Sequence, residues 1–278
     1  MPPEAGSAYQ VGVAGLGNLG THLAQAVTGV QGFSLAAVFS RRSAGAVQEV
    51  LPGVPLQSFP VSAHLKALDI LLLTLADDAI EPYARALGEL AAKSDSSASD
   101  LPMLVHCSGS QSIALLQGAA PQFNAGVFYP LQTFTVGAPV DWPKVPVFLE
   151  TPNTPTASDS PLAHLAEALR CNWQPLTSEE RQRLHLGAVF ASNFVNALVA
   201  ESDELLQAVQ GLDYRIYLPL LRQVVEKLER LPPAEAQTGP ASRGDKGVLQ
   251  RHEHLLSATD PKLLELYRLL TERIQKKA

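Results

Sequence analysis

The sequence predicts an α/β protein, in which a doubly wound, mostly parallel sheet is followed by an all-helical domain. Short apolar segments alternate with helical patterns through the first half, which is typical of a parallel sheet with crossover helices. A glycine-rich turn follows the first of these segments. After about residue 176 only helical patterns remain. We therefore expect two domains, residues 1–176 and 177–278.

The first domain should alternate strands and helices. Strands are expected near residues 9–15, 33–39, 69–75, 102–107, 125–129 and 145–150, and helices near 18–29, 43–51, 78–92 and 160–170. The run from Ile70 to Leu75 is apolar except for Thr74, which fits a strand buried on both faces of a parallel sheet. The polar stretches 93–100 and 151–160 are expected to be surface loops.

The second domain should begin at Thr177, because Glu179 and Glu180 would favour the first turn of a helix. The helical pattern then continues to Gln210, and Gly211 is a suitable stop. Further helices are expected near 213–230, 246–257 and 260–276. The Gly- and Pro-rich stretch 232–247 is expected to be a loop.

The composition argues against several classes of function. The net charge is −6 and no basic cluster is visible, so neither nucleic acid nor an anionic membrane surface is an expected partner. No run approaches the roughly 18 uninterrupted apolar residues of a membrane span, and the first residues do not resemble a signal peptide. The cysteines, Cys107 and Cys171, indicate neither a disulfide framework nor a zinc site. We expect a cytoplasmic protein without a bound metal.

A glycine motif between the first strand and the first helix carries the clearest chemical signal. It comprises Gly15, Leu16, Gly17, Asn18, Leu19 and Gly20. Gly15 permits a tight turn, Gly17 lets the backbone approach a pyrophosphate, and Gly20 lets helix and strand pack closely. Backbone N–H groups and the helix dipole would stabilise the phosphates. The alternative, a strand–turn–helix without a ligand, is disfavoured by the βαβ context.

The end of the second strand indicates which dinucleotide binds. NAD-specific sites have an Asp or Glu there, which binds the ribose 2′-hydroxyl. This sequence has Ser40, Arg41 and Arg42 instead. A hydroxyl and two guanidiniums would bind a 2′-phosphate, which a carboxylate would repel. We predict NADP, or NADPH, as the cofactor; the alternative is that both arginines are solvated loop charges.

Two later strand ends should border the same cofactor, because ligands bind outside the carboxyl ends of parallel strands. The predicted contacts are Leu75, Ala76 and Asp78 after one strand, and Cys107, Ser108 and Gly109 after the next. An Asp after the first of these strands is better explained as an N-cap of the following helix. Cys107 is predicted to be a small strand-end residue and no nucleophile, because no positive neighbour is evident.

With these residues assembled, the chain resembles the bacterial Rossmann-like proteins whose second half is called domain of unknown function 2520. Besides the glycine motif, the matching stretches are 106–110, 129–134, 185–196, and 238–245 with His252. That family is similar to pyrroline-5-carboxylate reductase, ketopantoate reductase and 6-phosphogluconate dehydrogenase. The resemblance implies an NADP-dependent oxidoreductase that dimerises through its helical domain. The resemblance does not identify the substrate.

The second domain offers candidate catalytic residues. The segment 186–200 is apolar almost all round, which predicts a buried helix. At about 100° per residue, His185 and Asn196 lie near one direction, with Asn193 about 80° away. The two amides either satisfy neighbouring backbone groups or form a polar wall facing the cofactor. Arg243 either pairs with Asp245 or binds a substrate carboxylate or phosphate.

We expect the active centre between the domains. The candidate catalytic residues are His185, Asn193, Asn196, Arg243 and His252. The expected reaction is hydride transfer between NADP(H) and a carbonyl, imine or hydroxy group of a small molecule, with Arg243 anchoring an anionic end. A non-catalytic NADP(H)-binding sensor or scaffold, and transfer to a second redox cofactor such as a deazaflavin, stay open as alternatives, because fold alone does not choose among them.

Overall fold

The computed structural model describes residues 8–94, 97–152 and 159–277. The chain divides into two compact units, residues 1–192 and 193–278, which are described separately below. The loop expected at 93–100 contains residues 95–96, and that expected at 151–160 contains residues 153–158; these parts lie outside the described residues.

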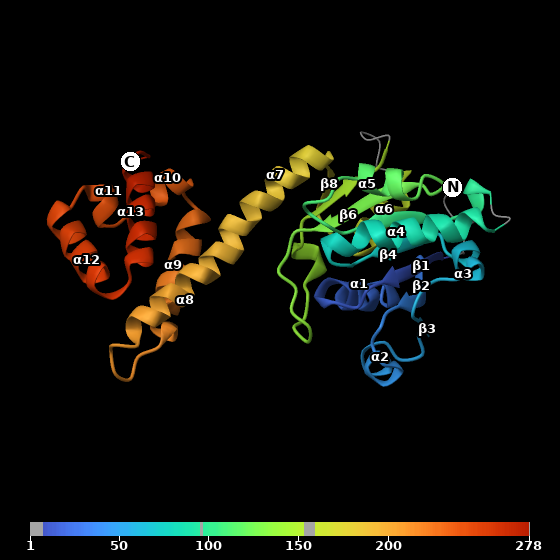
Figure 1. Cartoon of the computed structure of the whole chain (residues 1–278), viewed down its shortest axis with the longest axis horizontal. Coiled ribbons are helices and arrows are strands. Elements are labelled where there is room, and N and C mark those ends of the chain that lie inside the picture. The colour runs from blue at the N-terminus through green and yellow to red at the C-terminus, as the bar shows by residue number, and fades with distance from the viewer. Residues whose placement is uncertain (1–7, 95–96, 153–158, 278) are drawn as a thin grey trace. The chain divides into compact units, whose positions relative to one another are not determined.

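The first unit is built on an eight-stranded sheet in the order β3-β2-β1-β4-β5-β6-β7-β8 (Figure 1). Its strands are β1 (Tyr9–Ala14), β2 (Phe33–Phe39), β3 (Leu56–Gln57), β4 (Ile70–Leu73), β5 (Met103–His106), β6 (Ala125–Pro130), β7 (Val147–Glu150) and β8 (Trp173–Pro175). All neighbouring strands are parallel except β6 and β7, which are antiparallel. This sheet confirms the predicted fold class.

Helices cover both faces of the sheet. They are α1 (Asn18–Thr28), α2 (Ala44–Val50), α3 (Ser62–Ala67), α4 (Asp77–Ala92), α5 (Ala114–Ala119), α6 (Pro161–Ala168) and α7 (Ser178–Ala188). Leu23 of α1 and Leu165 of α6 belong to one hydrophobic core, whereas Leu87 of α4 and Leu116 of α5 belong to the other. All four residues of β4 are fully buried, as expected for a central strand with a core on each side.

Four elements of this unit were not expected from the sequence: β3, β8, α3 and α5. The two strands have two and three residues, and the two helices have six each. Segments this short span fewer than two hydrophobic periods, too few for periodicity to identify them. The strands gain their stability from pairing at the sheet edges, which local sequence does not encode.

Among its described residues, the second unit contains helices joined by turns and no strand, as predicted (Figure 1). Its helices are α8 (Phe194–Leu206), α9 (Leu218–Leu228), α10 (Pro233–Ala236), α11 (Pro240–Arg243), α12 (Lys246–Thr259) and α13 (Pro261–Gln275). The stretch 232–247 is therefore not a simple loop, because it contains α10 and α11. Their prolines occupy the first helical position, where no backbone N–H is needed.

The helix expected from residue 177 to 210 begins as predicted but is irregular. The Thr177 hydroxyl accepts a hydrogen bond from the Glu180 backbone, and the Glu180 carboxylate accepts one from the Thr177 backbone. A π-helical turn, Val189–Asn193, then separates α7 from α8. Because a π turn changes the angle per residue, a regular helical wheel cannot be carried from His185 to Asn196.

The expectation that segment 186–200 is buried is wrong for the single chain. Leu186, Phe190 and Phe194 are 59%, 63% and 46% exposed. Sequence periodicity shows that such a helix needs an apolar environment, but it does not show whether the same chain supplies it. By length and mean hydropathy alone, the helical stretch Ser178–Leu206 could cross a membrane.

Candidate cofactor site and active site

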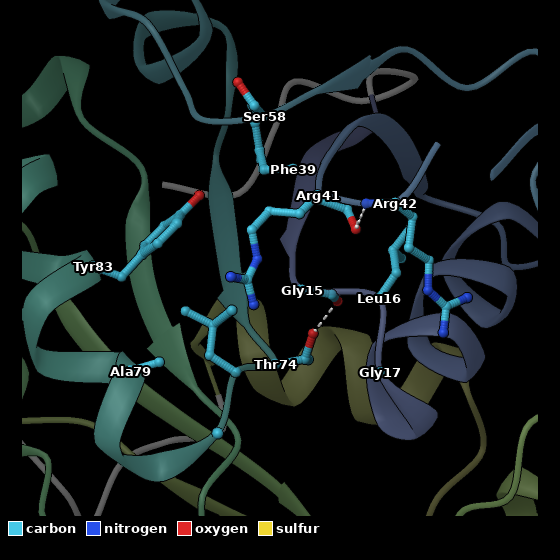
Figure 2. Close-up of a pocket in the computed structure, with 13 residues that line it drawn as sticks. Gly15, Leu16, Gly17, Phe39, Arg41, Arg42, Ser58, Thr74, Ala79 and Tyr83 are labelled. Carbon is cyan, nitrogen blue, oxygen red and sulfur yellow. Dashed lines mark hydrogen bonds between the residues drawn. The ribbon is translucent and has the colours of Figure 1, made fainter. Parts of the chain in front are cut away.

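A cavity of about 770 Å³ opens at the carboxyl ends of β1, β2 and β4 (Figure 2). It is lined by Gly15, Leu16, Gly17, Phe39, Ser40, Arg41, Arg42, Ser58, Thr74, Leu75, Ala76, Ala79 and Tyr83. The strand order reverses between β1 and β4, and α/β proteins bind ligands at such switch points. The cavity thus unites the glycine turn with the end of the second strand.

The glycine turn is shaped by close backbone packing. Gly15 has a φ of +94°, and its carbonyl accepts a 2.6 Å hydrogen bond from the Thr74 hydroxyl. A side chain at Gly20 would overlap the Gly15 carbonyl oxygen, so α1 packs this closely only with glycine there. At Gly17, the N-cap of α1, an added Cβ would have nothing within 4 Å. The turn therefore leaves free space over the N-terminus of α1.

Two cations face this space from the end of β2. The Arg41 guanidinium extends toward Tyr83, whereas that of Arg42 lies beside Leu16 (Figure 2). Both side chains are exposed, and neither forms a salt bridge with another described residue. The Ser40 hydroxyl accepts a hydrogen bond from the Arg42 backbone at 3.2 Å. Where NAD-specific sites have a carboxylate, this protein therefore carries two positively charged side chains.

Tyr83 adds an unsatisfied polar group to the opposite wall. Its hydroxyl is buried and has no hydrogen-bond partner among the described residues. Burial raises the pKa of this phenol well above its ordinary value. Its ring packs edge-on against Phe59, with centroids 4.9 Å apart. Because a buried polar group without a partner is costly, a ligand that bonded to this hydroxyl would gain affinity.

Several residues predicted to contact the cofactor are not in the cavity wall. They are Asn18, Leu19, Gly20, Asp78, Cys107, Ser108 and Gly109. The expectation of an aspartate N-cap is wrong: the N-cap of α4 is Ala76, and Asp77 is already helical. The Asp77 carboxylate instead accepts a short hydrogen bond from the Ser110 hydroxyl, which joins the start of α4 to the loop after β5.

Cys107 is buried in a hydrophobic core, and this burial raises its thiol pKa to about 12. The thiolate is the nucleophilic form of cysteine. A thiol that keeps its proton up to such a pH is a packing residue, which agrees with the prediction from the sequence.

His106, at the end of β5, is fully buried. Its Nδ1 accepts a hydrogen bond from the Ser108 backbone at 3.2 Å, and its Nε2 has no partner among the described residues. Burial, with the nearby Arg181 guanidinium, lowers its pKa to about 4. The ring is therefore neutral at physiological pH.

A buried ion pair fixes α7 to the sheet. Arg181 and Glu150 form a salt bridge, with side chains only 1% and 9% exposed. Arg181 also donates to the carbonyls of Ser108 and Gln111, and Glu150 accepts from the Ser178 backbone and hydroxyl. The pair therefore holds the loop after β5 against the start of α7. This pair cannot be predicted from the sequence, because its partners are 31 positions apart.

His185, one turn beyond Arg181, meets Tyr129 at the end of β6. The Tyr129 hydroxyl lies 2.9 Å from His185 Nδ1, and the rings are nearly perpendicular. Both rings lie against Gly109: an added Cβ there would be 2.5 Å from His185 Nδ1 and 2.8 Å from Tyr129 Cζ. Tyr129 is not among the predicted site residues, although it belongs to the stretch 129–134 that carries the family resemblance.

The other predicted catalytic residues belong to the second unit. Asn193 and Asn196 are exposed, so the expectation of buried amides is wrong for the single chain. Arg243 pairs with Asp245 at 2.8 Å, one of the two alternatives for this loop. His252 Nδ1 lies 3.0 Å from the Tyr267 hydroxyl. Within the described residues, no cluster of three or more potential metal ligands occurs.

Comparisons with known proteins agree with this architecture. Residues 145–274 match the family described as a domain of unknown function, DUF2520. No curated protein sequence is significantly similar to the chain. Among solved structures, a candidate NADP oxidoreductase from Bacteroides fragilis is 31% identical, with a TM-score of 0.81 over 97% of this chain and 98% of that one.

Two more distant structures share the fold. A protein from Thermotoga maritima is 20% identical, with a TM-score of 0.68 over 96% of this chain and 98% of that one. The pyrroline carboxylate reductase of Plasmodium falciparum, solved with NADP bound, is 11% identical, with a TM-score of 0.60 over 97% of this chain and 98% of that one. The matched domain and the full-length similarity to the Bacteroides protein show that this chain belongs to the family of Rossmann-type proteins that carry the domain of unknown function 2520.

Proposed function

We propose that this protein is an NADP(H)-dependent oxidoreductase that acts on a carbonyl, imine or hydroxy group of a small molecule. The observation that carries the proposal is that one cavity contains both the open turn at Gly17 and the unpaired side chains of Arg41 and Arg42. The similar Bacteroides protein, a candidate NADP oxidoreductase, supports the same activity.

The residues present suit each part of the cofactor. The N-terminus of α1 offers backbone N–H groups and a positive dipole to a pyrophosphate. Ser40 and the two arginines suit a 2′-phosphate, because guanidinium groups bind phosphate through paired hydrogen bonds. The unsatisfied Tyr83 hydroxyl would meet polar atoms of the adenosine. When bound, the nicotinamide would supply or accept a hydride, and the protein would position the substrate and stabilise charge.

Calorimetric titration with NADPH and NADH tests this proposal. We expect tighter binding of NADPH, because only NADPH carries the 2′-phosphate. Arg41→Ala and Arg42→Ala should each remove about 1–3 kcal/mol of this preference. Arg85→Ala is a matched control, because Arg85 pairs with Glu81 on α4 and does not line the cavity. Equal affinity for both nucleotides in the unmodified protein would contradict the proposal.

On the substrate side, we propose His185, Asn193, Asn196 and His252 as groups that bind or protonate the reacting atom. Arg243 would anchor an anionic end of the substrate, and its exposed pairing with Asp245 leaves the guanidinium accessible to an anion. Arg243→Ala should raise KM more than it lowers kcat. A sensor or scaffold would bind NADPH with the same preference but show no turnover with any ketone or imine.

We also propose that the second unit forms a homodimer. Helix α9 has no buried residue in the single chain. Its apolar side chains Leu220, Val224, Val225 and Leu228 are 63%, 50%, 59% and 46% exposed. Exposed apolar patches of this kind mark interaction surfaces, and the commonest partner is a second copy of the same chain.

Sedimentation analysis distinguishes a dimer from a monomer. Val225→Glu should weaken the dimer, because it would bury a charge at the interface. Gln223→Glu is a matched control, which adds the same charge at a polar position of the same helix. A monomer at micromolar concentration in the unmodified protein would contradict the proposal.

A further inference from the structure

We infer that Tyr129 and His185 form the proton-transfer pair of the active site: His185 Nε2 gives the proton to the substrate, and Tyr129 is the positioning residue that sets the protonation of the ring. The inference rests on the proposed function. It assigns a role to Tyr129 and selects His185 from the candidate acids.

The order of the strands places this pair at the nicotinamide end of the site. Arg41 and Arg42, the cations suited to the adenosine 2′-phosphate, follow β2, and the sheet continues from β2 through β1, β4 and β5 to β6. A dinucleotide bound with its pyrophosphate at the β1 turn and its 2′-phosphate at the end of β2 would extend its other end toward β5 and β6. The loop after β5 and the end of β6 carry Gly109 and Tyr129.

The strand register supports the same placement. Leu73 of β4 pairs with His106 of β5, which pairs with Val127 of β6. The residues that follow β4, including the cavity-lining Ala76, are therefore neighbours of the loop after β5. The hydrogen bond from Ser110 to Asp77 ties the start of α4 to the loop after β5. The Tyr129–His185 pair lies against Gly109 in that loop.

The hydrogen bond to Tyr129 determines where the neutral imidazole of His185 carries its proton. Tyr129 is 8% exposed, and among the described residues its hydroxyl has one hydrogen-bond partner, His185 Nδ1. Partial burial raises the pKa of this phenol, so the phenol keeps its proton, and among the described residues the one acceptor within reach is His185 Nδ1. Nδ1 is therefore the acceptor, and the neutral ring carries its proton on Nε2.

Packing fixes the position of the ring. Gly109 leaves the space that both rings occupy. Arg181, four residues before His185 on the same helix, is anchored by Glu150 and by the Ser108 carbonyl. A donor held in this way needs little reorganisation when charge develops on the substrate.

The reduction of a carbonyl or imine needs one proton and one hydride, of which His185 would supply the proton. In its charged form His185 carries both protons, with Nδ1–H donating to the Tyr129 oxygen. His185 Nε2 would give its proton to the substrate oxygen or nitrogen, and the substrate carbon would receive the hydride that the reduced cofactor supplies when bound. The ring is left as a neutral imidazole with its proton on Nδ1, and it returns to the resting Nε2–H form by proton exchange with solvent, because His185 is only partly buried.

The test uses ¹⁵N-histidine NMR on the full chain with NADP⁺ as the probe. Long-range ¹H–¹⁵N spectra distinguish Nδ1–H from Nε2–H, and a His185→Gln variant assigns the signals. We expect the neutral ring of His185 to be the Nε2–H form, and Tyr129→Phe to change it to a mixture of both forms. The matched control is His164, whose Nδ1 lies 3.1 Å from the Tyr9 hydroxyl; its signals should not change in Tyr129→Phe.

Binding then tests the location. NADP⁺ should shift the His185 signals and leave those of His164 unchanged, whereas 2′-phospho-ADP-ribose, which lacks the nicotinamide, should shift His185 far less. Gly109→Ala should reduce the NADP⁺-induced shift, because the added Cβ displaces the ring. An Nδ1–H form in the native chain, or NADP⁺ binding without any shift at His185, would overturn the inference and leave the proposed function standing. Absence of NADP⁺ binding by calorimetry would instead refute the proposed function.

Discussion

Two arginine–carboxylate pairs, one in each unit, differ sharply in their surroundings. In the first, Arg181 and Glu150 are almost completely buried, and Arg181 also donates to two backbone carbonyls. In the second, Arg243 and Asp245 are 63% and 37% exposed, and their pair bridges residues two positions apart. Removing one partner of a buried pair leaves the other charge without a counter-ion in a low-dielectric environment. When one partner of an exposed pair is removed, water solvates the charge that remains. The same chemistry is thus structural in one unit and available for binding in the other.

The apolar residues show the same contrast. Fully buried side chains are concentrated on the two faces of the sheet. In the second unit, the buried hydrophobic residues among those described are Leu206, Ala241, Leu249, Leu256 and Leu264. A helical unit with so few buried residues leaves much of its apolar surface in water. This is the physical reason for proposing a second copy of the chain as its partner.

The largest effect on stability should come from the buried pair. Glu150→Ala leaves the Arg181 charge buried without its counter-ion, and we expect a loss of about 3–5 kcal/mol in the free energy of unfolding. Urea unfolding followed by tryptophan fluorescence reports on this unit, because Trp142 and Trp173 both belong to it. A loss below about 1 kcal/mol would show that water or another group compensates the Arg181 charge.

A pH effect on the first unit should be slightly smaller. His106 has a folded-state pKa of about 4, against an ordinary value of about 6.5. Its neutral form contributes stability above pH 6.5, and this is lost as pH falls toward 4, because the unfolded chain binds the proton first. The loss should be about 3 kcal/mol. Urea midpoints measured from pH 7.5 to 4.5 would show this loss of stability. His106→Asn should flatten the dependence of the midpoint on pH. Equal slopes in the native protein and the variant would show that His106 is not the cause.

The smallest effect is expected at the exposed pair. Arg243→Ala should change the free energy of unfolding by about 0–1 kcal/mol. The change is best measured by circular dichroism, since the helical unit contains no tryptophan. A loss as large as that of Glu150→Ala would show that the two pairs are equivalent and would remove the contrast between the units.

The sequence was most informative where a backbone requirement is local. The turn at Gly15, the close packing at Gly20 and the capping box at Thr177 each depend on neighbouring residues, so motif spacing reveals them. The central strands were predicted for a similar reason, since burial on both faces leaves a continuous apolar run.

The sequence was least informative where segments that are far apart in the chain come into contact. Arg181 looks like an ordinary residue of a polar first turn, and its burial follows only from the loop after β5 and the end of β7. The contact of Tyr129 with His185 spans 56 positions. The π turn at 189–193 likewise arises in a segment whose pattern is simply helical. The hydrophobic periodicity of a single sequence reveals neither these long-range contacts nor the π turn.

The central claim is that the turn at Gly17 binds the dinucleotide, and calorimetric titration of Gly17→Val with NADPH tests it most directly. A Cβ at this position meets nothing within 4 Å, so the variant should fold normally while its side chain fills the space that the pyrophosphate needs. Gly118→Val, at another open glycine of the same unit, is the matched control. We predict that Gly17→Val abolishes measurable NADPH binding with an unchanged circular dichroism spectrum, and that Gly118→Val binds like the native chain. Unchanged NADPH affinity in a folded Gly17→Val protein would contradict the claim.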